Sequence, residues 1–168
     1  MPNTKPAKTE ENKINPSLQK KSAARVAAVQ CVYARVASDV PLAPAKQIAE
    51  LKARLKDNKT EQKLTLGLPL EPNYPLASDI VAGTLEFEAQ IDERINANLS
   101  AEWKRERMSQ VLLAILQCAL FELFFYKETP KHKIVIDEYT RLTARFFGDA
   151  EVNFVHGILQ KLHAEFHG

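Results

Sequence analysis

The chain has 168 residues and a formal net charge of +2, and 45% of its residues are hydrophobic. This size fits a single domain with a hydrophobic core, since domains typically hold about 100–150 residues. Two cysteines are too few for a disulfide-stabilised scaffold, so we expect a cytoplasmic protein in which Cys31 and Cys118 are reduced and buried.

The charge is unevenly distributed along the chain. Residues 1–25 hold six basic and two acidic residues, a net charge of +4, whereas the remainder carries −2. Residues 1–18 are polar and lack hydrophobic periodicity, so we expect a disordered basic arm ahead of one helical domain at 19–168. Such an arm is typical of polyanion binding, although a tail that only increases solubility would have the same composition.

Helical periodicity marks the first half of the domain. A stripe of valines predicts a helix over about 22–38, and a second helix is expected over about 44–56. Residues 57–77 contain Gly67 and three of the nine prolines, which predicts a long loop.

The second half lacks proline between residues 76 and 129, which favours long helices. We expect helices over about 78–99, 109–127 and 130–147, a short turn before the second of these, and a last helix from Asp149. The most apolar run, 111–126, is shorter than the roughly 20 residues that a membrane span needs, so it is predicted to lie inside a bundle. The fold class is therefore all-α, a compact bundle of about six to seven helices.

Two glycines, Gly83 and Gly157, fall inside these helical patterns. Glycine costs a helix about 1 kcal/mol relative to alanine, so each position needs a compensating reason. We expect close approach of a neighbouring helix, and the alternative is close approach of a ligand backbone.

Motifs for catalysis or metal binding are missing. His163 and His167 share a helix face, but the Glu that zinc peptidases place beside the first His is displaced. Glu122 lies in the apolar central segment, where it could be a catalytic carboxylate but more commonly pairs with a neighbour. No phosphate-binding glycine loop or nucleophile elbow is present. We therefore expect no enzyme activity, no cofactor and no metal.

A binding surface is better supported. Lys21 and Arg25 are four residues apart at the start of the first helix, next to Lys20, where the helix dipole also favours phosphate. Phe147 and Phe154 flank the last inter-helix turn, where they either stack on unpaired bases or belong to the core.

Four segments, taken together, resemble the NusB family of transcription antitermination factors. The match runs in the same order over about residues 20–166. The segments are AVQCVY at 28–33, AILQCALFEL at 114–123, VIDE at 135–138 followed by Phe-Gly at 147–148, and FVHGILQK at 154–161.

The resemblance implies two packed helical subdomains and a function in transcription. Family members bind the boxA element of nascent RNA together with the ribosomal protein NusE, and so help the elongation complex of RNA polymerase and other Nus factors to read through terminators during ribosomal RNA synthesis. The RNA face that the resemblance implies here consists of Lys20, Lys21, Arg25, Asn153 and Phe154.

The protein-partner face implied by the resemblance contains Tyr33 and Leu112. The chain departs from the family where Ser22 and Ala23 interrupt an arginine-rich helix start, and where Leu112 replaces an acidic residue. We therefore expect either weaker RNA binding or RNA binding that relies on the lysine-bearing arm, and a more apolar contact with NusE.

Two other functions fit the sequence. A diverged relative could bind proteins without RNA. A similar helical domain also precedes the catalytic domain of some RNA cytosine methyltransferases, but 168 residues leave no room for a cofactor-binding domain as well.

Overall fold

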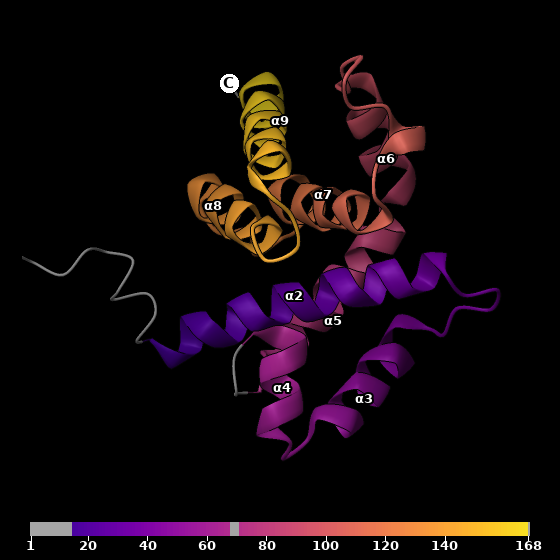
Figure 1. The fold of residues 1–168 in the computed structure, drawn as a ribbon, viewed down its shortest axis with the longest axis vertical. Coiled ribbons are helices and arrows are strands. Elements are labelled where there is room, and N and C mark those ends of the chain that lie inside the picture. The colour runs from indigo at the N-terminus through magenta and orange to yellow at the C-terminus, as the bar shows by residue number, and fades with distance from the viewer. Residues whose placement is uncertain (1–14, 68–70, 168) are drawn as a thin grey trace, which may run out of the picture.

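The structure, a computed structural model, describes residues 15–67 and 71–167. Within these ranges the chain forms eight α-helices, one 3₁₀ turn and no strand, so the all-α prediction is confirmed, with slightly more helices than expected (Figure 1). The elements are α2 (Pro16–Val36), α3 (Pro44–Leu55), α4 (Lys59–Leu66), α5 (Tyr74–Glu86), α6 (Glu88–Ala97), η1 (Arg105–Arg107), α7 (Gln110–Phe124), α8 (His132–Thr143) and α9 (Asp149–His167).

Helix α2 begins about two turns earlier than predicted. The Asn15 side chain accepts hydrogen bonds from the backbone N–H groups of Ser17 and Leu18, and Pro16 occupies the first helical turn, where its missing N–H costs nothing. The last residues of the expected arm at 1–18 are therefore helical. The rest of that predicted arm, residues 1–14, lies outside the described residues.

The predicted loop at 57–77 contains helical structure instead. Asn58 caps the start of α4, and Gly67 ends it with a φ of 82°, a conformation that favours glycine. Asn73 then caps α5, and Pro75 lies in the first turn of that helix, where proline is tolerated. The prolines in this segment led to the prediction of a loop. Proline is common both in turns and in the first turn of a helix, so its presence alone does not distinguish the two.

Helix α2 crosses the middle of the molecule. It packs mainly on α5 and α7, with α3 and α4 on one side of it and α7, α8 and α9 on the other (Figure 1). The helices on the second side contact one another chiefly through α7 and the α8–α9 pair. Two groups of helices therefore meet along α2, as the resemblance led us to expect.

Helix α7 forms the centre of the core. Every residue from Leu112 to Leu123 is buried, because other helices cover this helix on all sides. The prediction of a central buried helix is thus confirmed, and Cys31 and Cys118 are both buried free thiols. No helix in the described ranges is long and apolar enough to span a bilayer.

The two helical glycines differ in their surroundings. A Cβ added at Gly83 would lie 2.1 Å from two ring carbons of Phe121, so α5 and α7 approach as closely as they do because residue 83 has no side chain. Nothing lies within 4 Å of the corresponding position at Gly157. The expectation of close helix packing is confirmed for Gly83 and wrong for Gly157.

Alanine substitutions at these glycines should have opposite effects. Gly83→Ala should lower the free energy of unfolding by about 1–3 kcal/mol, because Phe121 must move within a packed core. Gly157→Ala, the matched control, should raise it by about 0.5–1 kcal/mol through helix propensity. Urea unfolding measures both, and a loss of stability in Gly157→Ala equal to that in Gly83→Ala would contradict this account.

Candidate functional site

The start of α2 carries two exposed lysines. Lys20 and Lys21 both have exposed side chains, and the backbone carbonyl of Lys20 accepts a 2.9 Å hydrogen bond from the N–H of Asn73. This bond fixes the first turns of α2 against the start of α5. The two charges are thus held in the second turn of α2, close to the start of α5.

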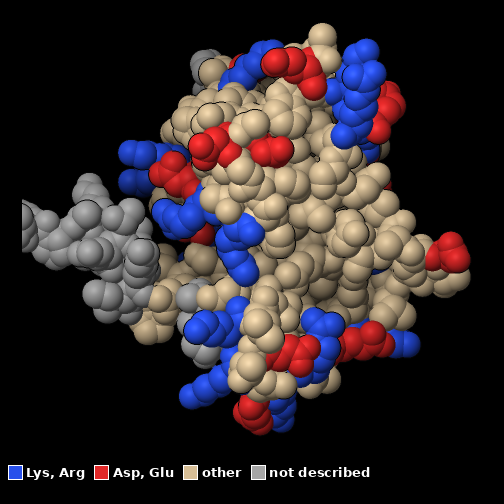
Figure 2. All heavy atoms as spheres, in the orientation of Figure 1, with Lys and Arg blue, Asp and Glu red and all other residues tan. Residues whose placement is uncertain are grey.

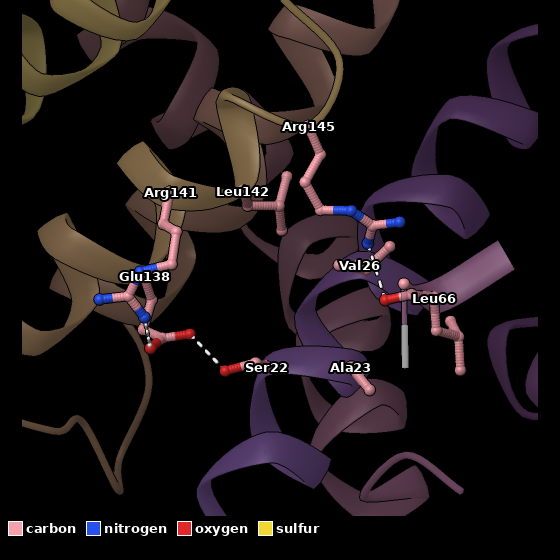
Figure 3. A pocket seen from close by; sticks show the side chains of 9 residues that line it. Ser22, Ala23, Val26, Leu66, Glu138, Arg141, Leu142 and Arg145 are labelled. Atoms are coloured by element: carbon pink, nitrogen blue, oxygen red, sulfur yellow. Dashed lines mark hydrogen bonds and ion pairs between the residues drawn. The ribbon is translucent and has the colours of Figure 1, made fainter. Parts of the chain in front are cut away.

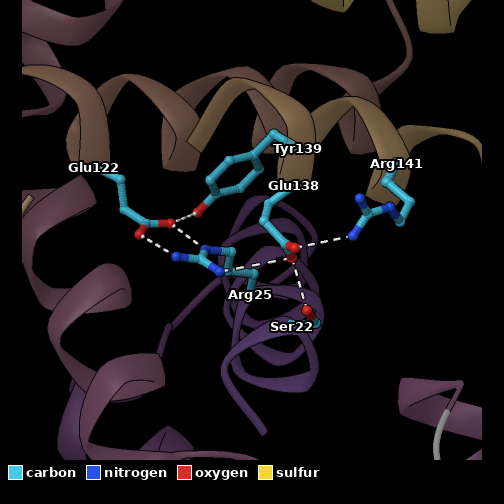
Figure 4. Close-up of polar contacts among 6 residues, drawn as sticks. All are labelled: Ser22, Arg25, Glu122, Glu138, Tyr139 and Arg141. Carbon is cyan, nitrogen blue, oxygen red and sulfur yellow. Dashed lines mark hydrogen bonds and ion pairs between the residues drawn. The ribbon is translucent and has the colours of Figure 1, made fainter. Parts of the chain in front are cut away.

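Arg25, one turn further along, is buried. Its side chain points between α7 and α8 and donates to the Glu122 carboxylate through Nε at 2.8 Å and through Nη2 at 3.0 Å (Figure 4). The Tyr139 hydroxyl donates to the same carboxylate. Only 3% of Arg25 is exposed, and Glu122 is wholly buried.

A second carboxylate links this network to the surface. Glu138 of α8 accepts a 2.7 Å hydrogen bond from the Ser22 hydroxyl and a 3.0 Å one from Arg141, and lies 3.6 Å from Nη1 of Arg25 (Figure 4). Ser22, one of the residues that depart from the arginine-rich family pattern, thus connects α2 with α8. The polar network therefore ties α2 to both α7 and α8.

Charge within the network is balanced. Burial by itself lowers the pKa of Arg25, but the charges of Glu122 and Glu138 outweigh it and raise that pKa above its ordinary value. Burial and the charge of Glu122 also raise the pKa of Tyr139 well above its ordinary value, so its hydroxyl keeps the proton that it donates. Arg25 therefore remains charged, fully paired and out of contact with solvent.

This burial conflicts with the prediction that Arg25 contacts RNA directly. The spacing of Lys21 and Arg25 placed them on one helix face, but α7 and α8 cover that face at residue 25. In this structure Arg25 instead joins α2 to α7 and α8 through Glu122 and Glu138. Glu122, which the sequence left open between catalysis and pairing, is the paired partner of this arginine.

The start of α9 presents an aromatic pair. Asn153 is exposed, and Phe154 is half-buried with its ring stacked on Trp103, at a centroid distance of 4.2 Å and an interplanar angle of 14°. Phe147 is also half-buried and packs against the core. Sequence reasoning missed the role of Trp103. Trp103 is the single tryptophan of the chain and lies in a polar turn. A large apolar side chain in such a turn indicates that a neighbouring apolar side chain covers it, and this could have been noted from the sequence.

An apolar patch lies at the other end of α2. Tyr33 is 42% exposed, and Val36 and Val40 beyond it are also exposed. In Figure 2, Lys and Arg side chains lie at the left, along the bottom and at the upper right of the view, and the middle of this face has few of them. Leu112, by contrast, is 1% exposed, so its side chain is unable to touch a partner in this structure. Val36 was missed because the valine stripe predicted its burial, and Val40 lies beyond the predicted helix, where no pattern indicated a role.

Comparison with known proteins gives a consistent result. The model of the NusB family matches residues 22–164. The chain is 34% identical over 153 residues to the transcription antitermination protein NusB of Bartonella henselae, covering 90% of this chain and 92% of that one. It is 30% identical over 167 residues to the protein of the same name from Bradyrhizobium diazoefficiens, covering 99% and 94% of the two chains.

The fold and the site define a class of protein: a compact helical binding protein whose longest helix carries a cationic start and an apolar end. The chain belongs to the NusB family of transcription antitermination proteins, a family of binding factors without enzymatic activity.

Removing Arg25 from its buried ion pair should lower the free energy of unfolding far more than removing an arginine from an exposed ion pair. Arg25→Ala leaves Glu122 charged and unpaired in the core, which should lower the free energy of unfolding by about 3–5 kcal/mol. The matched control is Arg54→Ala, because Arg54 forms a single 3.2 Å ion pair with Glu61 and its side chain is 56% exposed. This variant should lose less than about 1 kcal/mol. Equal losses in urea unfolding would show that the Arg25 pair is not buried in solution.

Proposed function

We propose that this protein is a cytoplasmic transcription antitermination factor that binds boxA-type single-stranded RNA together with the ribosomal protein NusE. The supporting observation is membership of the NusB family over residues 22–164, combined with two distinct exposed surfaces on α2. In this proposal the RNA–protein complex joins the elongation complex of RNA polymerase and other Nus factors.

The RNA surface in this proposal begins at Lys20 and Lys21. Both lysines are exposed cations in the second turn of α2, and such cations bind RNA phosphates. Asn153 and Phe154 open α9 and would supply a polar and an aromatic contact to an unpaired base. Trp103 covers one face of the Phe154 ring, so any base would meet that ring by its other face or its edge.

The NusE surface in this proposal is the patch of Tyr33, Val36 and Val40. Tyrosine is enriched at the centre of protein interfaces, and the exposed valines beside Tyr33 add apolar area that a partner could bury. Leu112 has no part in this contact, because it is buried. The partner surface is therefore expected to be largely apolar.

A second candidate function is a protein-binding factor that has lost RNA binding. The burial of Arg25 favours it, because one of the cations expected on the RNA face is committed to Glu122. Pull-down distinguishes the two: retention of NusE with no retention of RNA, even at low salt, supports this second function and contradicts the first.

The two lysines at the start of α2 should account for part of the salt dependence of RNA binding. Lys20→Ala combined with Lys21→Ala should weaken binding to boxA-type RNA. It should also reduce the slope of log K against log[salt] by about 1.4, because each phosphate contact on a single strand contributes about 0.7. Fluorescence anisotropy at several salt concentrations, with and without NusE, measures both effects.

The matched control replaces Lys46 and Lys56, two exposed lysines at the ends of the α3 segment, with alanine. It makes the same change in net charge and should leave the slope unchanged. Equal slopes for both double variants would refute a local role of Lys20 and Lys21. Absence of RNA binding by the wild-type protein, alone and with NusE, would refute the proposed function itself.

A further inference from the structure

A hollow lies between α2, the end of α4 and α8. Its volume is about 250 Å³, somewhat below the range typical of small-molecule pockets. Its walls are mainly apolar, and the polar groups of Ser22, Glu138, Arg141 and Arg145 also line it (Figure 3). The apolar residues in its lining are Ala23, Val26, Leu66 and Leu142.

The end of α8 and the turn that follows it provide two arginines to this hollow. Arg141 lies in the last turn of α8, Arg145 lies in the turn just after this helix, and both line the hollow (Figure 3). Arg141 forms an ion pair with Glu138, and its side chain is 55% exposed. Arg145 has no carboxylate within ion-pair distance among the residues that the structure describes. The hollow therefore carries one more positive than negative charge.

The position of Arg145 is fixed by the end of α4. Its Nη1 donates a 2.7 Å hydrogen bond to the carbonyl of Leu66, where the negative end of the helix dipole favours a cation (Figure 3). A Cβ on Gly67 would lie 2.7 Å from Cζ of Arg145, so the guanidinium occupies space that only glycine leaves free. Desolvation lowers the pKa of Arg145, as expected for a cation without an acidic partner.

We propose that this hollow holds one unstacked base of the RNA strand that binds at the start of α2, with the flanking phosphates near Arg141 and Arg145. This inference rests on the proposed function and adds a second recognition element to it. Unpaired bases are bound by stacking on apolar or guanidinium surfaces and by hydrogen bonds to their edges.

The location and chemistry of the hollow favour RNA over other occupants. Ser22, which lines it, directly follows Lys21 in α2, so the hollow lies about 100° around the helix from this lysine, within reach of neighbouring nucleotides of one strand. The apolar walls fit the face of a base, the hydroxyl of Ser22 and the carboxylate of Glu138 can meet its polar edge, and the arginines complement the phosphates.

An abasic scan tests this inference. The RNA is a boxA-type single strand in which each nucleotide in turn lacks its base, and affinity is measured by fluorescence anisotropy. For the wild-type protein, removal of one particular base should weaken binding about tenfold. Ser22→Leu fills the hollow from its rim, and in this variant the same abasic position should weaken binding less than about twofold.

Two arginine variants distinguish binding of a base in the hollow from a general effect of positive charge on RNA affinity. Arg141→Ala should weaken binding of the intact RNA and reduce the effect of the sensitive abasic position. Arg54→Ala, with a similar exposure and a single Glu partner, should behave as wild type. If Ser22→Leu is poorly folded by circular dichroism, Val26→Leu fills the hollow from its wall and takes its place.

Several results would overturn the base-binding inference and leave the proposed function intact. One is an abasic profile that is the same for Ser22→Leu and wild type. A second is a loss of affinity in Arg141→Ala that is uniform across all abasic RNAs, which would indicate charge alone. A third is binding of a free mononucleotide in the hollow that RNA does not displace. If wild-type protein binds no RNA, the proposed function fails first.

Discussion

The Arg25 guanidinium donates two hydrogen bonds to the Glu122 carboxylate in a mainly apolar interior. Two charges removed from water are stabilised only when each has several partners, and here Tyr139 and Glu138 complete the set. Since these groups come from α2, α7 and α8, the pair fixes how the long helix lies across the two groups of helices. An apolar contact would tolerate sliding along the helix, whereas hydrogen bonds at fixed distances specify one register.

That register matters because α2 carries both candidate surfaces. Its first turns expose Lys20 and Lys21, and its last turns lead into the patch around Tyr33. The helix between them sets the distance between the two candidate surfaces. Through Glu138, the same network reaches Arg141 at the rim of the hollow on α8. Fold and function are thus linked through one group of buried polar side chains.

Local pattern predicted much of the fold, and long-range packing decided the rest. The run around α7 is apolar on every side, so its central position followed from sequence alone. Helix α4 was missed because the capping signals of Asn58 and Gly67 are short, and nearby prolines indicated a loop. Arg25 has the spacing of a surface cation, and its burial depends on Glu122, 97 residues away. The exposure of Lys20 and Lys21 does not depend on a distant partner, so their place in the sequence was sufficient to predict that they are exposed.

The most direct test replaces the whole buried network with apolar residues: Arg25→Met, Glu122→Leu and Tyr139→Phe together. Replacing Arg25 and Glu122 together removes both buried charges, and Glu138 keeps Ser22 and Arg141 as partners, so the triple variant should fold with stability near that of the wild type. If Arg25 acts only by positioning α2, the variant should bind boxA-type RNA more weakly than wild type, because the register of α2 is no longer specified, but with an unchanged salt slope. A folded triple variant whose slope of log K against log[salt] falls by about 0.7 would contradict the account, because that change is expected when one direct phosphate contact is lost.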